Sequence, residues 1–86
     1  VMNLAKKTPA THLLVVRHRD RPGVLAHVFH CLRSGDINVQ ETENVIFEGA
    51  EAAVARSNLD GAPSDALLKQ MQDGNADILD LHLVTI

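Results

Sequence analysis

The sequence is poor in aromatic residues and in cysteine. It has no Trp, no Tyr and only two Phe among 86 residues, so a hydrophobic core must be built from aliphatic side chains. A single cysteine, Cys31, excludes an internal disulfide and with it the small secreted domains that depend on disulfides. No apolar run approaches the ~20 residues that a membrane-spanning helix requires, and no signal peptide is visible. We therefore expect a cytoplasmic protein with no membrane partner.

An excess of positive charge is also missing. Eight Lys and Arg against eleven Asp and Glu give a formal net charge of −3, whereas proteins that bind nucleic acid neutralise phosphates with Lys and Arg. A sheet that binds RNA would also need aromatic side chains on which bases stack. We therefore expect no nucleic-acid partner.

The length allows one domain, and 45% of the residues are hydrophobic. A domain of this size buries roughly 60% of its unfolded surface, so association with a second copy or a larger neighbour would add useful stability. Residues 1–11 contain two Lys, one Pro and no hydrophobic periodicity, which predicts a linker from an upstream domain. Residues 12–86 are expected to form the folded, regulatory domain.

The hydrophobic pattern predicts six elements in the order β-α-β-β-α-β. Apolar runs predict four strands, and apolar residues at helical spacing predict two helices. The strands are expected over 12–18, 37–47, 50–58 and 78–86, with a helix that ends at Gly35 and another from Ser64 to Gly74. This order predicts an α+β, ferredoxin-like βαββαβ sandwich, in which two helices cover one face of a four-stranded antiparallel sheet.

Residues of the capping type stand at the ends of both helices. Asp20 is a candidate N-cap of the first helix, with Pro22 in its first turn, and Ser64 is a candidate N-cap of the second. Gly35 is expected to end the first helix in the left-handed conformation. In the last strand, alternation predicts a buried side formed by Leu79, Leu81 and Leu83.

The segment between the first strand and the first helix has the composition of a ligand-binding loop. Gly23 would let backbone approach a ligand closely, and a helix start presents amide N–H groups that suit a carboxylate. Asp20 could accept hydrogen bonds from an ammonium group. A small zwitterion fits this combination. The alternative is that Asp20 only caps the helix and that Pro22 and Gly23 only turn the chain.

Two motifs in this region identify a family. They are His18-x-Asp20-Arg21-Pro22-Gly23-Val24-Leu25 and, after Leu32, Ile37-Asn38-Val39. Together they resemble the ACT domain, a small amino-acid-binding regulatory module of metabolic enzymes, and are most similar to the C-terminal regulatory domain of D-3-phosphoglycerate dehydrogenases. The resemblance covers residues 12–86 and implies the same βαββαβ fold.

The resemblance also implies a binding site. ACT domains often pair side by side as a homodimer through sheet extension, and the effector, L-serine in these dehydrogenases, lies at the seam. The residues implied from one copy are His18, Asp20, Gly23, Val24 and Leu25, with Asn38 from the partner copy. The family often has Asn where this chain has Asp20, and a carboxylate there favours the ammonium group of a ligand. A solvated polar residue early in a strand is an equally good description of Asn38.

By the same resemblance, this domain is a regulatory fragment and not an enzyme. Its neighbours in the parent chain would be the catalytic domains of an NAD-dependent oxidoreductase of serine biosynthesis, so NAD is expected in the parent enzyme and no cofactor in this domain. One alternative is a dimerisation or packing module without an effector. Another is an ACT domain that serves a different enzyme of amino-acid metabolism.

No catalytic or metal-binding pattern is predicted. Cys31 and Ser57 have no base at a recognisable spacing, and no phosphate-binding glycine loop is present. His27 and His30 are three residues apart on the polar side of the first helix, whereas Cys31 belongs to its apolar side, so we do not expect the three to converge on a metal. Cys31 is expected in the core.

Overall fold

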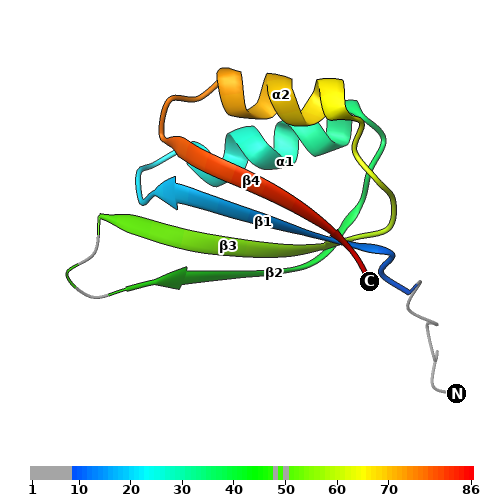
Figure 1. Ribbon diagram of the computed structural model, residues 1–86, viewed down its shortest axis with the longest axis horizontal. Helices are drawn as coiled ribbons and strands as arrows, with labels where there is room; N and C mark the ends of the chain where they lie inside the picture. The colour runs from blue at the N-terminus through cyan, green and yellow to red at the C-terminus, as the bar shows by residue number, and fades with distance from the viewer. Residues whose placement is uncertain (1–8, 48, 50) are drawn as a thin grey trace, which may run out of the picture.

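The computed structural model describes residues 9–47, 49 and 51–86. Its elements confirm the predicted order: β1 (His12–Arg19), α1 (Val24–Ser34), β2 (Val39–Ile46), β3 (Ala52–Leu59), α2 (Asp65–Asp73) and β4 (Ile78–Thr85) (Figure 1). The predicted turn between the second and third strands includes Glu48, and the third strand was expected to start at Ala50. Both positions lie outside the described residues.

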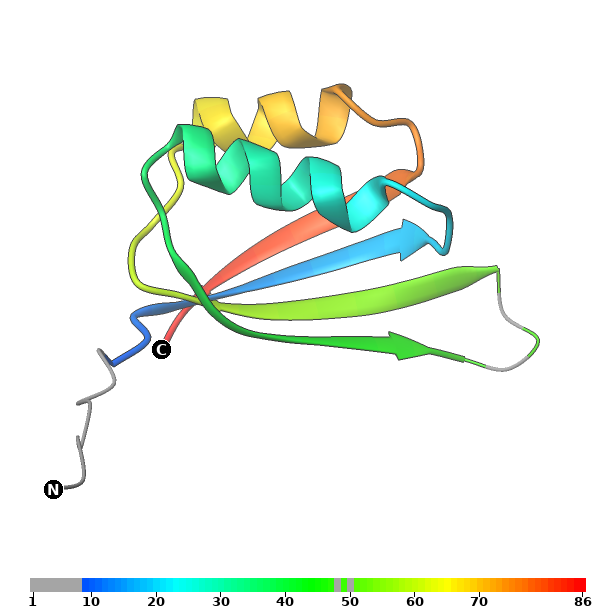
Figure 2. The ribbon, with the colours of Figure 1, turned by 180° about the vertical axis from the view of Figure 1, so that it is seen from behind.

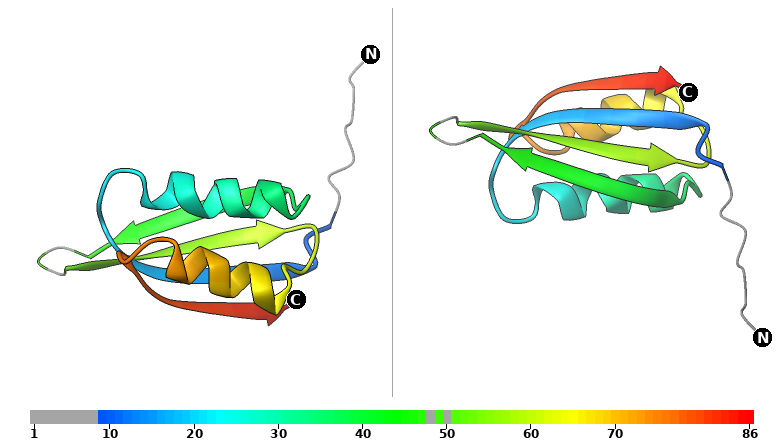
Figure 3. Two further views of the ribbon diagram at one scale, coloured as in Figure 1. Left: turned by 90° about the horizontal axis from the view of Figure 1, so that it is seen from above. Right: turned by 90° about the horizontal axis from the view of Figure 1, so that it is seen from below.

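The four strands form one antiparallel sheet in the order β2-β3-β1-β4, so β2 and β4 are the edges. Both helices lie on the same face of this sheet, as the two opposite views show (Figures 1 and 2). Seen from above, the helices lie over the strands, and seen from below no helix or strand of the described residues covers the other face of the sheet (Figure 3). The predicted ferredoxin-like sandwich is therefore confirmed.

The core lies between the helices and the central strand β1. Leu14 and Val16 alternate along β1 on the side of the helices and have no exposed surface. They pack with Val28 of α1 and Met71 of α2, which are equally buried. Because each fully buried aliphatic side chain contributes about 1.5–3 kcal/mol, this aliphatic layer fixes which face of β1 turns inward.

The start of α1 corrects the capping prediction for Asp20. The N-cap is Gly23, with a φ of +88°, and no side chain caps this helix. A positive φ lies outside the helical region, so the turn at Pro22 and Gly23 separates Asp20 from the first helical residue, Val24. Asp20 is thus too far along the chain to accept from the first-turn amides, and the prediction that it caps α1 is wrong.

The end of α1 is a Schellman motif in which the left-handed residue is Asp36, with a φ of +58°. The amide of Ile37 donates to the Leu32 carbonyl at 3.0 Å, and the amide of Asp36 donates to the Arg33 carbonyl at 3.0 Å. Gly35 itself has a φ of −90°, so the predicted left-handed conformation at Gly35 is wrong. A Cβ at Gly35 would come within 2.6 Å of the Leu67 side chain in α2, so a larger residue there would require that flexible side chain to move.

The start of α2 agrees with the prediction. Ser64 is its N-cap, and its hydroxyl oxygen accepts a hydrogen bond from the amide of Leu67 at 3.1 Å. The helix ends at Gly74, as expected. A Cβ at Gly74 would meet the His27 ring of α1 at 2.8 Å, so this glycine also allows the two helices to approach.

Two strands deviate from the predicted pattern. The second begins at Val39, two residues later than expected, because the Schellman motif uses the Ile37 amide. The last strand has an irregularity opposite Arg17 and His18, where its register against β1 shifts. The shift places Ile78 in the core and leaves Leu79 outside it, whereas Leu81 and Leu83 pack inward as predicted.

Candidate functional site

Five of the six predicted site residues lie where β1 ends and α1 begins. We call this region, residues 18–26, the β1–α1 corner. The Arg21 amide donates to the Arg19 carbonyl at 2.9 Å, which closes the turn. A Cβ at Gly23 would meet no atom within 4 Å, so its left-handed conformation, and not crowding, is what requires glycine.

Two amide groups in the first turn of α1 are not used by the described part of the chain. The Val24 amide reaches the Arg21 carbonyl at 3.4 Å, but no described residue accepts from the amides of Leu25 and Ala26. The first N–H groups of a helix also carry the positive end of its dipole. The corner therefore offers donors that match a carboxylate.

The Asp20 carboxylate supplies the opposite charge at the same corner. Its side chain is exposed and makes no hydrogen bond or ion pair with the described residues. It borders a shallow pocket of about 310 Å³ together with Arg19, Arg21 and Glu51. A carboxylate that no internal cation neutralises can accept hydrogen bonds from an ammonium group.

The two arginines of this pocket are paired with Asp77, in the turn between α2 and β4. Their guanidinium groups lie 3.7 Å (Arg19) and 3.5 Å (Arg21) from Asp77 Oδ1. The Arg19 amide also donates to the Asp77 carbonyl at 2.8 Å. Exposed ion pairs of this kind contribute ~0–1 kcal/mol each, so an anionic ligand could compete with Asp77 for either arginine.

His18 lies inside the corner, with 1% of its surface exposed. Its Nδ1 is 2.9 Å from the Arg19 carbonyl oxygen, and its Nε2 is 3.0 Å from Oδ1 of Asn44 in β2. Both ring nitrogens are thus bonded within the chain. The sequence analysis missed Asn44, because its contact with His18 depends on how β2 and β3 pair and spans 26 residues.

Asn38, the sixth predicted residue, lies at the opposite end of the sheet within one chain. It is exposed and precedes β2. Its side-chain amide donates to the Asp60 carboxylate at 3.0 Å, and its backbone amide donates to the same carboxylate at 2.9 Å. The Asp60 amide in turn donates to the Asn38 carbonyl at 3.2 Å. These bonds tie the entry of β2 to the exit of β3.

A groove of about 560 Å³ runs between α1 and the first half of β2. Phe29 and Val39 supply apolar surface to it, and Arg33 and Glu41 supply charges of both signs. Because β2 is an edge strand, this groove borders the unpaired hydrogen-bonding groups of the sheet. The edge and the groove together form one surface.

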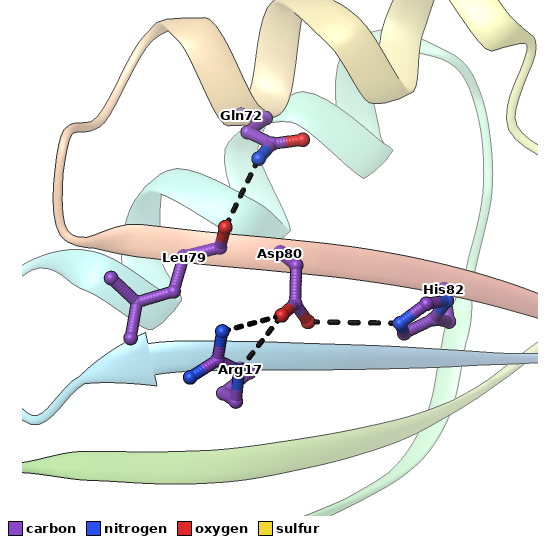
Figure 4. A network of polar contacts seen from close by, with 5 residues as sticks. All are labelled: Arg17, Gln72, Leu79, Asp80 and His82. Atoms are coloured by element: carbon purple, nitrogen blue, oxygen red, sulfur yellow. Dashed lines mark hydrogen bonds and ion pairs between the residues drawn. The ribbon is translucent and has the colours of Figure 1, made fainter.

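The open face of the sheet carries a separate network of charges, drawn in Figure 4. Arg17 donates from Nε to the Asp80 carboxylate at 2.8 Å, and Asp80 also lies 3.8 Å from the His82 ring. Figure 4 also shows a bond outside this network, in which Gln72 of α2 donates to the Leu79 carbonyl of the edge strand β4 at 3.2 Å. Arg17 and His18 are neighbours in a strand and point to opposite faces, so this network does not contribute to the corner.

The buried thiol does not form a reactive site. Cys31 is 4% exposed, and burial raises the pKa of its thiol, which keeps the sulfur protonated. His27 approaches it more closely than expected, at 3.8 Å, because His27 Nε2 turns inward to the Met71 carbonyl at 2.8 Å. Among the described residues, no group of three His, Cys, Asp or Glu side chains could hold a metal. No helix in the described ranges has the length and apolarity to cross a bilayer.

Comparison by sequence finds no relative. No protein-family model matches the chain, and no curated protein matches it. The similarities reported below therefore rest on the comparison of structures alone.

Comparison of structures finds the same fold in proteins of low sequence identity. The chain is similar to the C-terminal domain of the MgtC protein from Mycobacterium tuberculosis, with a TM-score of 0.68 and 15% identity over 96% of this chain and 94% of that one. It is also similar to an ACT domain protein from Streptococcus pneumoniae, with a TM-score of 0.66 and 11% identity over 88% of this chain and 89% of that one.

A third similar structure is the regulatory subunit of aspartate kinase from Thermus thermophilus in its ligand-free form. The TM-score is 0.64 with 19% identity, over 88% of this chain and 52% of that subunit. The chain thus spans about half the length of this subunit. These similarities show that the protein has an ACT-like fold.

Proposed function

We propose that this chain is a regulatory domain that binds a small amino acid at the β1–α1 corner. The observation that carries the proposal is that two complementary groups belong to one loop and to the helix turn that follows it. Asp20 offers a carboxylate with no partner among the described residues, and Leu25 and Ala26 offer amides that no described residue uses. A free α-amino acid has an ammonium group for the first and a carboxylate for the second.

The proposed site keeps the residues implied by the motif. Asp20 and the backbone of Gly23, Val24 and Leu25 would contact the ligand from one copy, and Asn38 from a second copy. His18 belongs to the same site as the buried ring bonded to the Arg19 carbonyl. The pocket of about 310 Å³ beside Asp20 is lined by charged side chains of both signs, and the resemblance of the motifs makes L-serine the first ligand to test.

Sheet extension by a second copy is part of the same proposal. Asn38 and the corner lie at opposite ends of one sheet. If two β2 edges pair antiparallel around a two-fold axis, the start of one β2 lies beside the end of the other. The Asn38 side chain of the partner would then approach the corner. The free edge of β2 and the groove beside it support this surface as the interface.

The parent enzyme in this proposal is a cytoplasmic, NAD-dependent D-3-phosphoglycerate dehydrogenase under feedback control by serine. Only the motif resemblance supports this finer assignment. A ligand held between two copies shifts the pair toward the arrangement that it binds more tightly. The attached catalytic domains would follow that shift.

Isothermal titration calorimetry with L-serine, glycine, L-alanine and L-aspartate tests the proposal. We expect L-serine to bind and Asp20→Ala to weaken binding roughly ten- to a hundredfold, since a hydrogen bond to a charged group contributes ~1.5–3 kcal/mol. Asp73→Ala, a change of the same kind at an exposed site at the end of α2, is the matched control. Absence of heat with every amino acid would reject an effector site.

The role of Asn38 needs its own control, because Asn38 also bonds to Asp60 within the chain. Asn38→Ala should weaken both binding and dimerisation in sedimentation measurements. Asp60→Ala removes the same side-chain bond, together with the bond from the Asn38 backbone amide, but leaves the Asn38 side chain in place. Equal losses of affinity in both variants would mean that Asn38 acts only inside its own chain.

A packing module without an effector is the second candidate. The observation in its favour is that both nitrogens of His18 are already bonded within the chain. In that case the chain would dimerise with the same affinity whether or not amino acids are present.

A further inference from the structure

The heavy-atom positions around His18 and Asn44 determine which nitrogen atoms of the two side chains carry protons toward each other. The Arg19 carbonyl can only accept, so the His18 Nδ1 that faces it at 2.9 Å must carry a proton. In the neutral ring Nε2 then holds a lone pair and has to accept a hydrogen bond. Asn44 can supply that bond only through its amide N–H, because an amide oxygen accepts and does not donate.

The protonated ring imposes the opposite arrangement. Its Nε2 carries a proton and donates, so Asn44 has to present Oδ1, which is the atom placed 3.0 Å from Nε2. The oxygen and nitrogen of an Asn side chain exchange places by a half-turn of the amide. Asn44 can therefore satisfy Nε2 in either charge state, which a purely accepting or purely apolar side chain cannot do.

None of the other described residues around the ring offers a side chain that could form the hydrogen bond with Nε2 in place of Asn44. The register partners of His18 are Ala53 in β3 and Ile78 in β4, which have no polar side chains. The neighbouring Arg17 and Arg19 are paired with Asp80 and Asp77. The buried residues of the two helices are apolar except for the thiol of Cys31. A ring that is 1% exposed cannot use water instead.

From this geometry we propose that Asn44 is a positioning residue. It holds the inner edge of His18 in both charge states and so connects the edge strand β2 to the β1–α1 corner. His18 in turn is bonded to the carbonyl of Arg19, the residue that precedes Asp20. A change at the β2 edge that displaces Asn44 would therefore displace the His18 ring, and with it the loop at Arg19. The consequence for ligand affinity rests on the proposed function, whereas the proton arrangement does not.

Nitrogen NMR of the His18 ring and the Asn44 side-chain amide tests the inference without a ligand. In the wild-type chain at alkaline pH, we expect Nδ1 to be protonated and Nε2 unprotonated. Beside a ring that carries both protons, the Asn44 side-chain amide signals should differ from those beside the neutral ring. The side-chain signals of Asn58, which lies in β3 and is not bonded to the ring, are the internal control. A neutral ring protonated on Nε2, or Asn44 signals that are the same beside both forms of the ring, would overturn the inference.

Variants separate the positioning role from simple packing. Asn44→Asp offers only an acceptor, so Nε2 of His18 should carry a proton under conditions in which NMR finds it unprotonated in the wild-type chain, whereas Asn58→Asp should leave Nε2 as in the wild type. Asn44→Leu should lower the affinity for L-serine about tenfold, as for one lost hydrogen bond, in a chain that remains folded by circular dichroism. An unprotonated Nε2 in Asn44→Asp under those conditions would overturn the inference even if Asn44→Leu does not fold. Failure of the wild-type chain to bind any amino acid would reject the proposed function and leave the NMR result to decide the role of Asn44.

Discussion

The two helices of this domain begin in different ways. In α2 the Ser64 hydroxyl accepts from the Leu67 amide at 3.1 Å. The start of α1 has no side-chain cap among the described residues, and Gly23 leads into it with a left-handed backbone. Both helices face the same core, so packing does not explain the difference. An amide that a side chain already binds is not free for a ligand, whereas the amides of Leu25 and Ala26 remain unused by the described residues.

The corner around α1 is held in place without using those donors. Asp77 binds the flanking arginines, and Asn44 binds the ring of His18. These contacts come from the α2–β4 turn and from β2, on either side of the loop. The loop is thus fixed by its neighbours while the described residues leave the amides of Leu25 and Ala26 unused, an arrangement that suits binding with little reorganisation.

Among changes at the two helix starts, Gly23→Ala should have the largest effect on stability. A Cβ has open space at this position, but a φ of +88° is strained for any residue with a Cβ. We expect a loss of ~1–2 kcal/mol in the free energy of unfolding, measured by urea denaturation. Gly61→Ala is the control, since its added Cβ also meets open space and its φ is not positive. Equal stability of the two variants would show that the left-handed turn does not form.

Removal of the cap of α2 should have the next largest effect. Ser64→Ala leaves the Leu67 amide without its partner, and we expect a loss of about 1 kcal/mol of stability. Ser64→Asp keeps an acceptor at the cap and should stay close to the wild type. If Ser64→Ala unfolds at the same urea concentration as the wild type, the Ser64 hydroxyl does not stabilise the start of α2.

The smallest effect on stability is expected for Asp20→Ala. Asp20 does not cap α1, so the free energy of unfolding should change by less than about 0.5 kcal/mol, as for other exposed substitutions. The same variant is expected to lose ligand affinity. A loss of stability as large as that of Ser64→Ala would mean that Asp20 caps the helix after all.

The sequence predicted those features that depend on neighbouring residues. The order of the elements, the inward position of Leu81 and Leu83 and the Ser64 cap all follow from local patterns. The left-handed residue was predicted at Gly35 and is Asp36, because the composition does not show at which residue the hydrogen bonds that end the helix place the reversal.

The contacts that shape the candidate site span long distances in the sequence and could not be predicted. Asn44 meets His18 across 26 residues, and Asp60 meets Asn38 across 22. Each pair depends on strand register, which a single irregularity displaces, as the shift of β4 at Ile78 shows. The motif located the corner, but only the fold identifies the residues that support it.

The most direct test of the account compares the two helix starts in one experiment. L-serine is titrated into the uniformly ¹⁵N-labelled chain, and the backbone amide signals are followed by NMR. We expect saturable shifts at Gly23, Leu25 and Ala26, and no shift at the amide of Leu67, which Ser64 already binds. Shifts of equal size at both helix starts, or none at α1, would contradict it.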